Sequence, residues 1–283
     1  MSMLAWVVIV TAIAGVGGTG LGGVVSACFR KDSTKTVSLL LSFAGGVMLS
    51  IVCFDLVAGA IHPDGAAKET SIWLIIAGIT FGYAVVALLN NVIDRATNHE
   101  VPHIDKSHPK TADALDELYH SNHMEVHKEQ HSSLFVAGVV MACAIALHNV
   151  PEGMVIGASY ASSGSQSLFT GTGLVLAIVI GLHNIPEGMA VAVPLISGGM
   201  HRTKAILVTA LSGAPTILGA ILGYYLGVMG PTMLALSLCF ASGAMLYVVF
   251  GELLPEAILM WRSKLPAGAV LVGMLTGLII IYR

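Results

Sequence analysis

The chain has 283 residues, of which 55% are hydrophobic and only 10% are charged, and its mean hydropathy is +0.85. A soluble domain carries about 25% charged residues, so this composition excludes an ordinary soluble protein. The formal net charge of −3 says little about partners if most of the chain lies in lipid.

Long apolar runs recur along the whole chain. A run of about 20 apolar residues is long enough to cross a bilayer as an α-helix, whereas a spanning strand needs only about 9–11 and alternates. We therefore predict an all-α polytopic membrane protein with eight spans. The predicted spans are 3–28, 36–61, 71–93, 133–159, 167–196, 203–226, 231–254 and 266–282. No basic residue precedes the first run, so we expect a membrane span there and not a cleaved signal peptide.

Basic residues are distributed unevenly between the connecting segments. One side of the membrane receives Arg30, Lys31, Lys35, Arg95, Lys106, Lys110, Lys128, Arg202, Lys204, Arg262 and Lys264, and the other receives only Lys68 and Arg283. Because positively charged loops stay in the cytoplasm, both termini are predicted to be extracytoplasmic. The chain then divides into helices one to three (1–94), a cytoplasmic His-rich loop (95–132) and helices four to eight (133–283), with all eight helices forming one transmembrane domain.

Acidic residues lie within the apolar runs or at their ends, without basic partners. They are Asp55, Glu152, Glu187, Glu252 and Glu256, whereas no Lys or Arg lies well inside a run. A buried carboxylate is costly unless something offsets its charge. Either these acids are protonated or a cation neutralises them, and the histidines beside two of them favour the cation.

One short motif occurs twice, as HNVPEG at residues 148–153 and HNIPEG at residues 183–188. Residues i and i+4 share a helix face, so each copy places a histidine beside a glutamate. The two helices run in opposite directions, and both motifs fall near the middle of their spans. We therefore expect two imidazoles and two carboxylates to converge.

Prolines within both copies strengthen this interpretation. Pro151 and Pro186 cannot donate a backbone hydrogen bond, so each frees a carbonyl near the motif. Transport sites near the midplane often lie on irregular helices, whose free carbonyls line a cavity. A single buried histidine or a single proline would more often be ordinary packing, but two matching copies favour a metal site. The motif is not HExxH, so it lacks the general base of a zinc protease at the expected place.

The paired motifs on consecutive spans, with a His-bearing segment after the third span, resemble the ZIP family of divalent-metal transporters. The resemblance covers nearly the whole chain. It implies a three-two-three helix bundle with outward termini, in which helices one to three and six to eight form an inverted repeat. It also implies transport of Zn²⁺, and often Fe²⁺, Mn²⁺ or Cd²⁺, into the cytoplasm. For this family, sliding of one helix group against the other has been proposed.

The resemblance also assigns roles to individual residues. The implied main site consists of His148, Glu152, His183 and Glu187, and an adjacent second site includes Asn149 and Asn184. The resemblance also makes Met48 a sulfur ligand, Asp55 a ligand at the entrance and Glu252 a ligand at the exit. Without the resemblance, Met48 would be a packing residue, and Asp55 and Glu252 could be solvated helix ends.

The chain departs from the family pattern on helix six, where Thr216 occupies a position that is a glutamate in many members. Two carboxylates remain at the paired site, enough to balance one divalent ion, so we expect one tightly bound ion. Nitrogen and oxygen ligands suit Zn²⁺ and its transition-metal neighbours, whereas Mg²⁺ and Ca²⁺ prefer all-oxygen sites.

Seven of the 11 histidines lie in residues 95–132. His120, His123, His127 and His131 are spaced to share one helix face. The segment is either a solvated linker or a weak metal trap that receives ions after release, and we favour metal contact.

The sequence as a whole predicts a Zn²⁺ uptake transporter of the cytoplasmic membrane. We expect it not to be an enzyme and to need no organic cofactor. Its expected partners are divalent metal ions and the lipid bilayer, with no nucleic acid, and a homodimer is left open. The alternatives are an intramembrane metal-dependent hydrolase, which would need an open metal position and an activated water, and a metal exporter with the same ligands.

Overall fold

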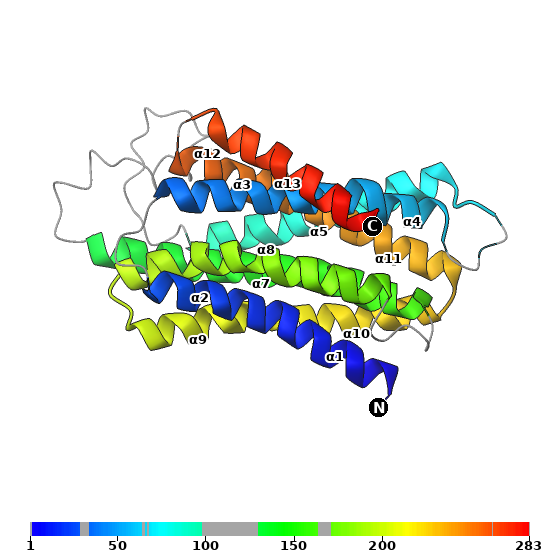
Figure 1. Ribbon diagram of the computed structural model, residues 1–283, viewed down its shortest axis with the longest axis horizontal. Coiled ribbons are helices and arrows are strands. Elements are labelled where there is room, and N and C mark those ends of the chain that lie inside the picture. Colours follow the sequence, from blue (N-terminus) through cyan, green and yellow to red (C-terminus); the bar gives the residue numbers. More distant parts are fainter. Residues whose placement is uncertain are drawn as a thin grey trace.

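The computed structural model describes residues 2–28, 34–63, 66, 68–97, 130–163, 171–261 and 263–282. Every regular element in these ranges is helical, and none is a strand. Long helices lie side by side along the longest axis of the molecule (Figure 1). The all-α prediction is therefore confirmed.

The helices follow the predicted apolar runs closely. In chain order they are α1 (Met3–Ala12), η1 (Ile13–Gly17), α2 (Gly18–Cys28), α3 (Thr34–Ser50), η2 (Ile51–Leu56), α4 (Val57–Ile61), α5 (Ile72–Thr97), α7 (Gln130–Ser163), α8 (Thr172–Ser197), α9 (Arg202–Ser212), α10 (Pro215–Val228), α11 (Pro231–Tyr247), η4 (Val248–Leu253), α12 (Leu254–Met260) and α13 (Leu265–Ile281). The three η segments are π-helical, with one extra residue per turn, and each continues directly into α-helix on both sides.

Seven helical stretches of the described chain are long and apolar enough to cross a membrane. The eighth predicted span corresponds to α13, an apolar helix of 17 residues. Both chain termini lie toward the same end of the molecule (Figure 1), as an even number of crossings requires. The number of crossings and the side on which the termini lie remain predictions.

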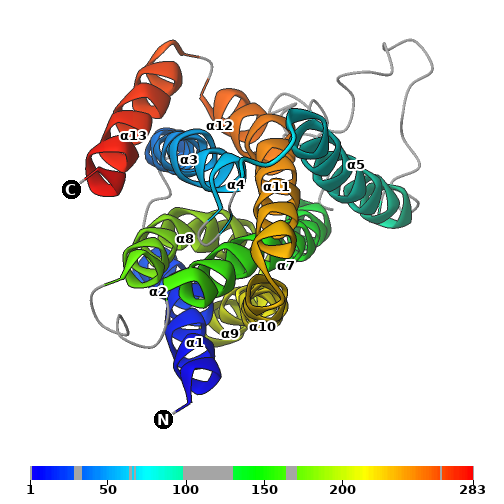
Figure 2. The same cartoon turned by 90° about the vertical axis from the view of Figure 1, so that its right-hand side faces the viewer.

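The helices form two layers, which are clearest in the end view of Figure 2. The first layer, called the site bundle here, contains α1–η1–α2, α7, α8 and α9–α10, whose main packing partners are one another. The second layer, called the flanking bundle, contains α3–η2–α4, α5, α11–η4–α12 and α13. The two bundles meet where α7 packs on α11 and α5, and where α8 packs on α3.

Glycines bring the helices of each bundle into backbone contact. A methyl group added at Gly153 on α7 would meet the carbonyl oxygen of Thr216 on α10, and one added at Gly46 on α3 would meet that of Val270 on α13. Small residues allow membrane helices to approach in this way. Among the described glycines, every close approach to another helix stays within one bundle. None of the described glycines makes such a contact across the seam between the bundles.

The flanking bundle contains an internal repeat that the sequence analysis did not detect. Residues 43–56 read FAGGVMLSIVCFDL and residues 240–253 read FASGAMLYVVFGEL, identical at seven of fourteen positions. The last six residues of each copy form the π-helical segments η2 and η4. Figure 1 shows that the two helices run in opposite directions. This repeat supports the inverted relation implied by the family resemblance.

Candidate metal site

The two motif copies lie on α7 and α8, which pack against each other within the site bundle. Both helices continue unbroken through their prolines, Pro151 and Pro186. The glycine that ends each motif lets a neighbouring helix approach: Gly153 faces α10, and Gly188 faces the backbone of Thr19 on α2. The motif therefore supplies ligand-type side chains and the close packing that fixes their helices.

The four ligand-type side chains pair across the two helices and not along them. His148 Nε2 on α7 lies 3.1 Å from Glu187 Oε2 on α8. His183 Nε2 on α8 lies 2.7 Å from Glu152 Oε1 on α7. All four residues are buried, with relative exposures from 0% to 3%. The structure thus brings together the four residues that the sequence predicts for the main site, through crossed pairs.

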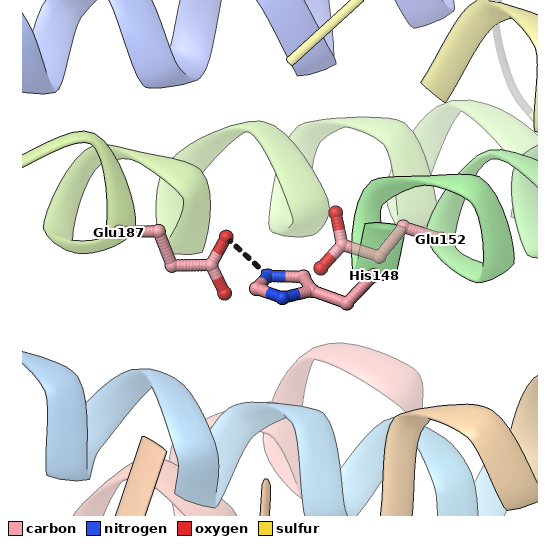
Figure 3. A group of neighbouring side chains, drawn as sticks. All are labelled: His148, Glu152 and Glu187. Atoms are coloured by element: carbon pink, nitrogen blue, oxygen red, sulfur yellow. Dashed lines mark ion pairs between the residues drawn. The ribbon is translucent and has the colours of Figure 1, made fainter. Parts of the chain in front are cut away.

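Three of these residues form a compact group of metal-ligand atoms. His148, Glu152 and Glu187 each offer one atom, and these atoms lie within 4.8 Å of one another. Figure 3 shows the three side chains pointing into the same space between α7 and α8. His183 joins the group through its contact with Glu152.

Several buried polar atoms of this group lack a hydrogen-bond partner among the described residues. They include Nδ1 of His183 and Oε1 of Glu187. The two ring nitrogens of His148 lie near Glu187 and Glu252, but neither contact has hydrogen-bond geometry. Buried polar groups are nearly always satisfied, so such a concentration of unsatisfied atoms calls for an explanation. A bound cation would use these lone pairs and balance the carboxylate charge.

Asn184 reaches both glutamates. Hydrogen bonding assigns its inward amide atom as nitrogen, which lies 3.1 Å from Glu152 Oε2 and 3.2 Å from Glu187 Oε2. In this orientation the amide donates to the metal-free carboxylates. A half-turn of the amide would present its oxygen as a ligand, so Asn184 can serve the site with or without an ion.

Asn149 is held more firmly and by different partners. Its amide nitrogen donates to the carbonyls of Ile145 at 2.9 Å and Ser212 at 3.1 Å, and its oxygen accepts from the hydroxyl of Thr216 at 2.9 Å. The side chain therefore joins α7 to α9 and α10. To serve as a metal ligand, Asn149 would have to use the remaining lone pair of an oxygen that is already hydrogen-bonded.

The residues predicted for the entrance and exit lie on the flanking bundle. Glu252 belongs to η4, and its Oε2 lies 3.8 Å from His148 Nδ1, so it contacts the buried group directly. Asp55 belongs to η2 and is partly exposed. Met48 is fully buried near the end of α3. Glu252 thus reaches the four-residue group from the flanking bundle.

The histidine stripe of the predicted cytoplasmic loop falls mostly outside the described residues. This applies to His120, His123 and His127, and to the side chain of His131, whose backbone lies in the first turn of α7. The metal contact predicted for these histidines therefore stays a prediction.

Sequence reasoning missed the partners that position the site and the equivalence of Met48 with Met245. Both methionines are fully buried and occupy the same position of the internal repeat. The same comparison aligns Asp55 with Glu252. A search of the chain against itself would have revealed both equivalences.

The sequence also matches known proteins over most of its length. A family model described as ZIP Zinc transporter matches residues 5–282. A protein of Akkermansia muciniphila named Zinc transporter ZupT is 32% identical over 274 residues, covering 95% of this chain and 94% of that protein. Proteins of the same name from Corynebacterium glutamicum and Campylobacter jejuni are 31% and 34% identical, covering 90% and 84% of this chain and 90% and 83% of their own lengths.

Proposed function

Because the chain belongs to the ZIP zinc transporter family, we propose that it carries divalent transition-metal ions, chiefly Zn²⁺, across the cytoplasmic membrane into the cytoplasm. The observation that carries the proposal is the buried group of His148, Glu152 and Glu187, whose ligand atoms lie within 4.8 Å of one another. Among the described residues, neither buried carboxylate pairs with a Lys or Arg, and one divalent cation would match the charge of both.

The proposed membrane topology has eight spans in a three-two-three arrangement with extracytoplasmic termini. The helix α13 has 17 residues, which at about 1.5 Å per residue is close to the shortest length that crosses a bilayer. The position of both termini toward one end of the molecule supports an even number of spans (Figure 1).

The donor set explains the proposed choice of ion. Imidazole nitrogen and carboxylate oxygen suit Zn²⁺, Fe²⁺, Mn²⁺ and Cd²⁺, and a thioether from Met48 would favour the softer ions among these. Ca²⁺ and Mg²⁺ prefer shells made only of oxygen. The donor types alone do not separate the transition metals from one another, so the preference for Zn²⁺ rests on the relatives.

The proposed path runs from Asp55 at the extracytoplasmic side to the four-residue site and then past Glu252 toward the cytoplasm. Alternating access would expose the buried group to each side in turn. The loop histidines would hold ions weakly after their release. Glu252 already lies against His148, so the step from site to exit is short.

We further propose that the site holds one ion tightly. Glu152 and Glu187 contribute a charge of −2, and the Asn149 oxygen at the second-site position already accepts a hydrogen bond from Thr216. Two divalent ions about 4 Å apart would repel by about 17 kcal/mol at an effective dielectric constant of about 20. Glu252 adds negative charge nearby, but its side chain is 17% exposed and lies on the other bundle.

Zn²⁺ flux into proteoliposomes that contain a fluorescent zinc indicator tests the function. We expect Zn²⁺-dependent uptake above that of protein-free vesicles, with oriented insertion showing transport from the extracytoplasmic to the cytoplasmic face. Transport only in the opposite direction would indicate an exporter. No transport, together with Zn²⁺-dependent hydrolysis of a peptide or ester substrate, would favour the hydrolase.

A further inference from the structure

The segment between α4 and α5 carries a histidine and a glutamate that lie outside the proposed site. His62 directly follows α4, and its Nδ1 lies 3.5 Å from Oε1 of Glu69. The two side chains are 65% and 73% exposed, so the pair lies on the surface, where an ion can reach it. In the proposed topology this segment lies at the extracytoplasmic mouth.

The backbone brings the two residues together. The amide of Thr70 donates to the carbonyl of Ile61 at 3.0 Å, a closure that holds the backbones next to His62 and Glu69 close together. His62 and Glu69 are the first and last residues inside this closure. The pair is therefore preorganised, and a ligand that bound both residues would not have to pay the full cost of ordering the segment.

The separation of the two atoms suits a shared metal ion. Zn²⁺ binds imidazole nitrogen and carboxylate oxygen at about 2.0–2.2 Å in a tetrahedral arrangement, which places two ligand atoms about 3.3–3.6 Å apart. The observed 3.5 Å falls in that range. As a purely structural ion pair, such an exposed contact would contribute little to stability.

Ligand-type side chains also recur along this part of the chain. Met48, Asp55 and His62 follow one another at intervals of seven residues, about 10 Å each along a helix. Their exposure rises in the same order, from the fully buried Met48 through the partly exposed Asp55 to the exposed His62. Asp55 lies within the π-helical segment η2, whose wider turns change the spacing, so the regularity is one of depth and not of a single helix face.

We propose that His62 and Glu69 form a low-affinity capture site for Zn²⁺ and similar divalent ions at the mouth of the transport path. This inference rests on the proposed uptake function and orientation. Two protein ligands leave the other coordination positions to water, so the ion is held weakly and released readily toward Asp55. The site would raise the supply of ions when external metal is scarce and matter little at saturation.

Initial rates of Zn²⁺ uptake into oriented proteoliposomes test the proposal. We expect His62→Ala and Glu69→Gln each to raise KM for Zn²⁺ about 3–10-fold while leaving the maximal rate unchanged. The double variant should be no worse than the poorer single variant, because two ligands of one ion do not act additively. The matched control is His201→Ala, which removes an exposed histidine before α9 and should leave KM unchanged.

A charge-changing variant and added salt distinguish metal coordination by the pair from a purely electrostatic effect on KM. Lys68→Gln alters the charge beside Glu69 without removing a metal-ligand atom. If only surface charge mattered, this variant would lower KM, His62→Ala would leave KM unchanged, and added salt would erase every difference. That outcome would overturn the capture site, whereas a raised KM of His62→Ala that persists in salt would support it.

Equilibrium Zn²⁺ binding to the purified proteins gives a readout that does not depend on transport. Each pair variant should lose one weakly bound ion relative to the unmodified chain, and His201→Ala should lose none. If both pair variants kept the KM and the weak Zn²⁺ binding of the unmodified chain, and that chain took up Zn²⁺ normally, the capture site would be refuted and the proposed function would stand. Absence of uptake by the unmodified chain would refute the proposed function, and the binding comparison would still decide on the pair.

Discussion

The two bundles are built alike but carry different chemistry. In both, glycines allow backbone contact between helices, as at Gly153 in the site bundle and Gly46 in the flanking bundle. All four residues of the buried site belong to the site bundle. The flanking bundle contributes Glu252, which reaches His148 across the seam.

This difference indicates that one bundle can bind the ion while the other controls whether the site is open to either side of the membrane. The ligands are fixed to one another because α7 and α8 pack together and their motif glycines hold α10 and α2 closely. The described glycines make no such close contacts across the seam. A shift along the seam would keep the four residues of the buried site together and move Glu252 relative to His148, as the sliding motion proposed for the family requires.

The largest expected effect comes from removing charge from the site bundle. Glu152→Gln or Glu187→Gln removes one of two buried carboxylates, so an ion would keep uncompensated charge in a poorly solvated place. We expect Zn²⁺ flux in proteoliposomes to fall about 100-fold or more while the protein still inserts and folds. The matched control is Glu256→Gln on α12 of the flanking bundle, which should retain flux within about threefold. Normal flux from a folded Glu187→Gln protein would remove the basis of the assigned site.

The second prediction tests whether both bundles depend equally on their glycines. A valine at Gly153 or Gly46 would place side-chain atoms against a backbone carbonyl of the neighbouring helix. Overpacking of this kind costs about 1–3 kcal/mol, so each variant should lower the melting temperature in detergent by about 2–12 °C. Gly268→Val serves as the control, because Gly268 has no neighbouring atom within 4 Å in its Cβ direction. Equal melting temperatures for all three variants would show that the close contacts do not hold the bundles together.

The third prediction concerns the number of ions on the site bundle. Thr216→Glu removes the hydrogen bond to Asn149 and adds a carboxylate beside it. With the loop histidines replaced, calorimetric titration should show one tight Zn²⁺ site in the parent chain and a strengthened second site in the variant. Two equally tight buried ions in the parent would contradict the single-ion proposal.

The smallest effect is expected from the histidines of the predicted cytoplasmic loop. Replacing His120, His123, His127 and His131 by alanine changes no residue of the buried site. Zn²⁺ flux should stay within about twofold, and weak Zn²⁺ binding should decrease. Loss of flux from a correctly inserted variant would instead place the histidines on the transport path.

The sequence predicts the helices well because lipid imposes a simple requirement. Each crossing needs a long apolar run, and these runs end at polar or charged residues. The close spacing of His148 with Glu152 and of His183 with Glu187 likewise shows that each pair lies on one helix face. These inferences need only the local geometry of a helix.

The contacts between helices could not be predicted in the same way. Local spacing pairs His148 with Glu152, yet His148 lies against Glu187 because α7 and α8 pack side by side. Glu252 resembled a residue at the end of its helix, but it reaches His148 from a π-helical segment. Hydropathy does not reveal an extra residue in a helical turn, nor which apolar helix packs on which.

The internal repeat relates the two halves of the flanking bundle, but the side chains at equivalent positions do not make equivalent contacts. Asp55 and Glu252 occupy the fifth residue of matching π-helical segments, and Glu252 lies 3.8 Å from a histidine of the first motif. Within the described chain, Asp55 forms no corresponding ion pair with His183 of the second motif. If the two halves exchanged these relations, the molecule would approximate itself rotated by half a turn about an axis in the membrane plane. Two copies of one segment would thus account for both an inward-open and an outward-open arrangement of the helices.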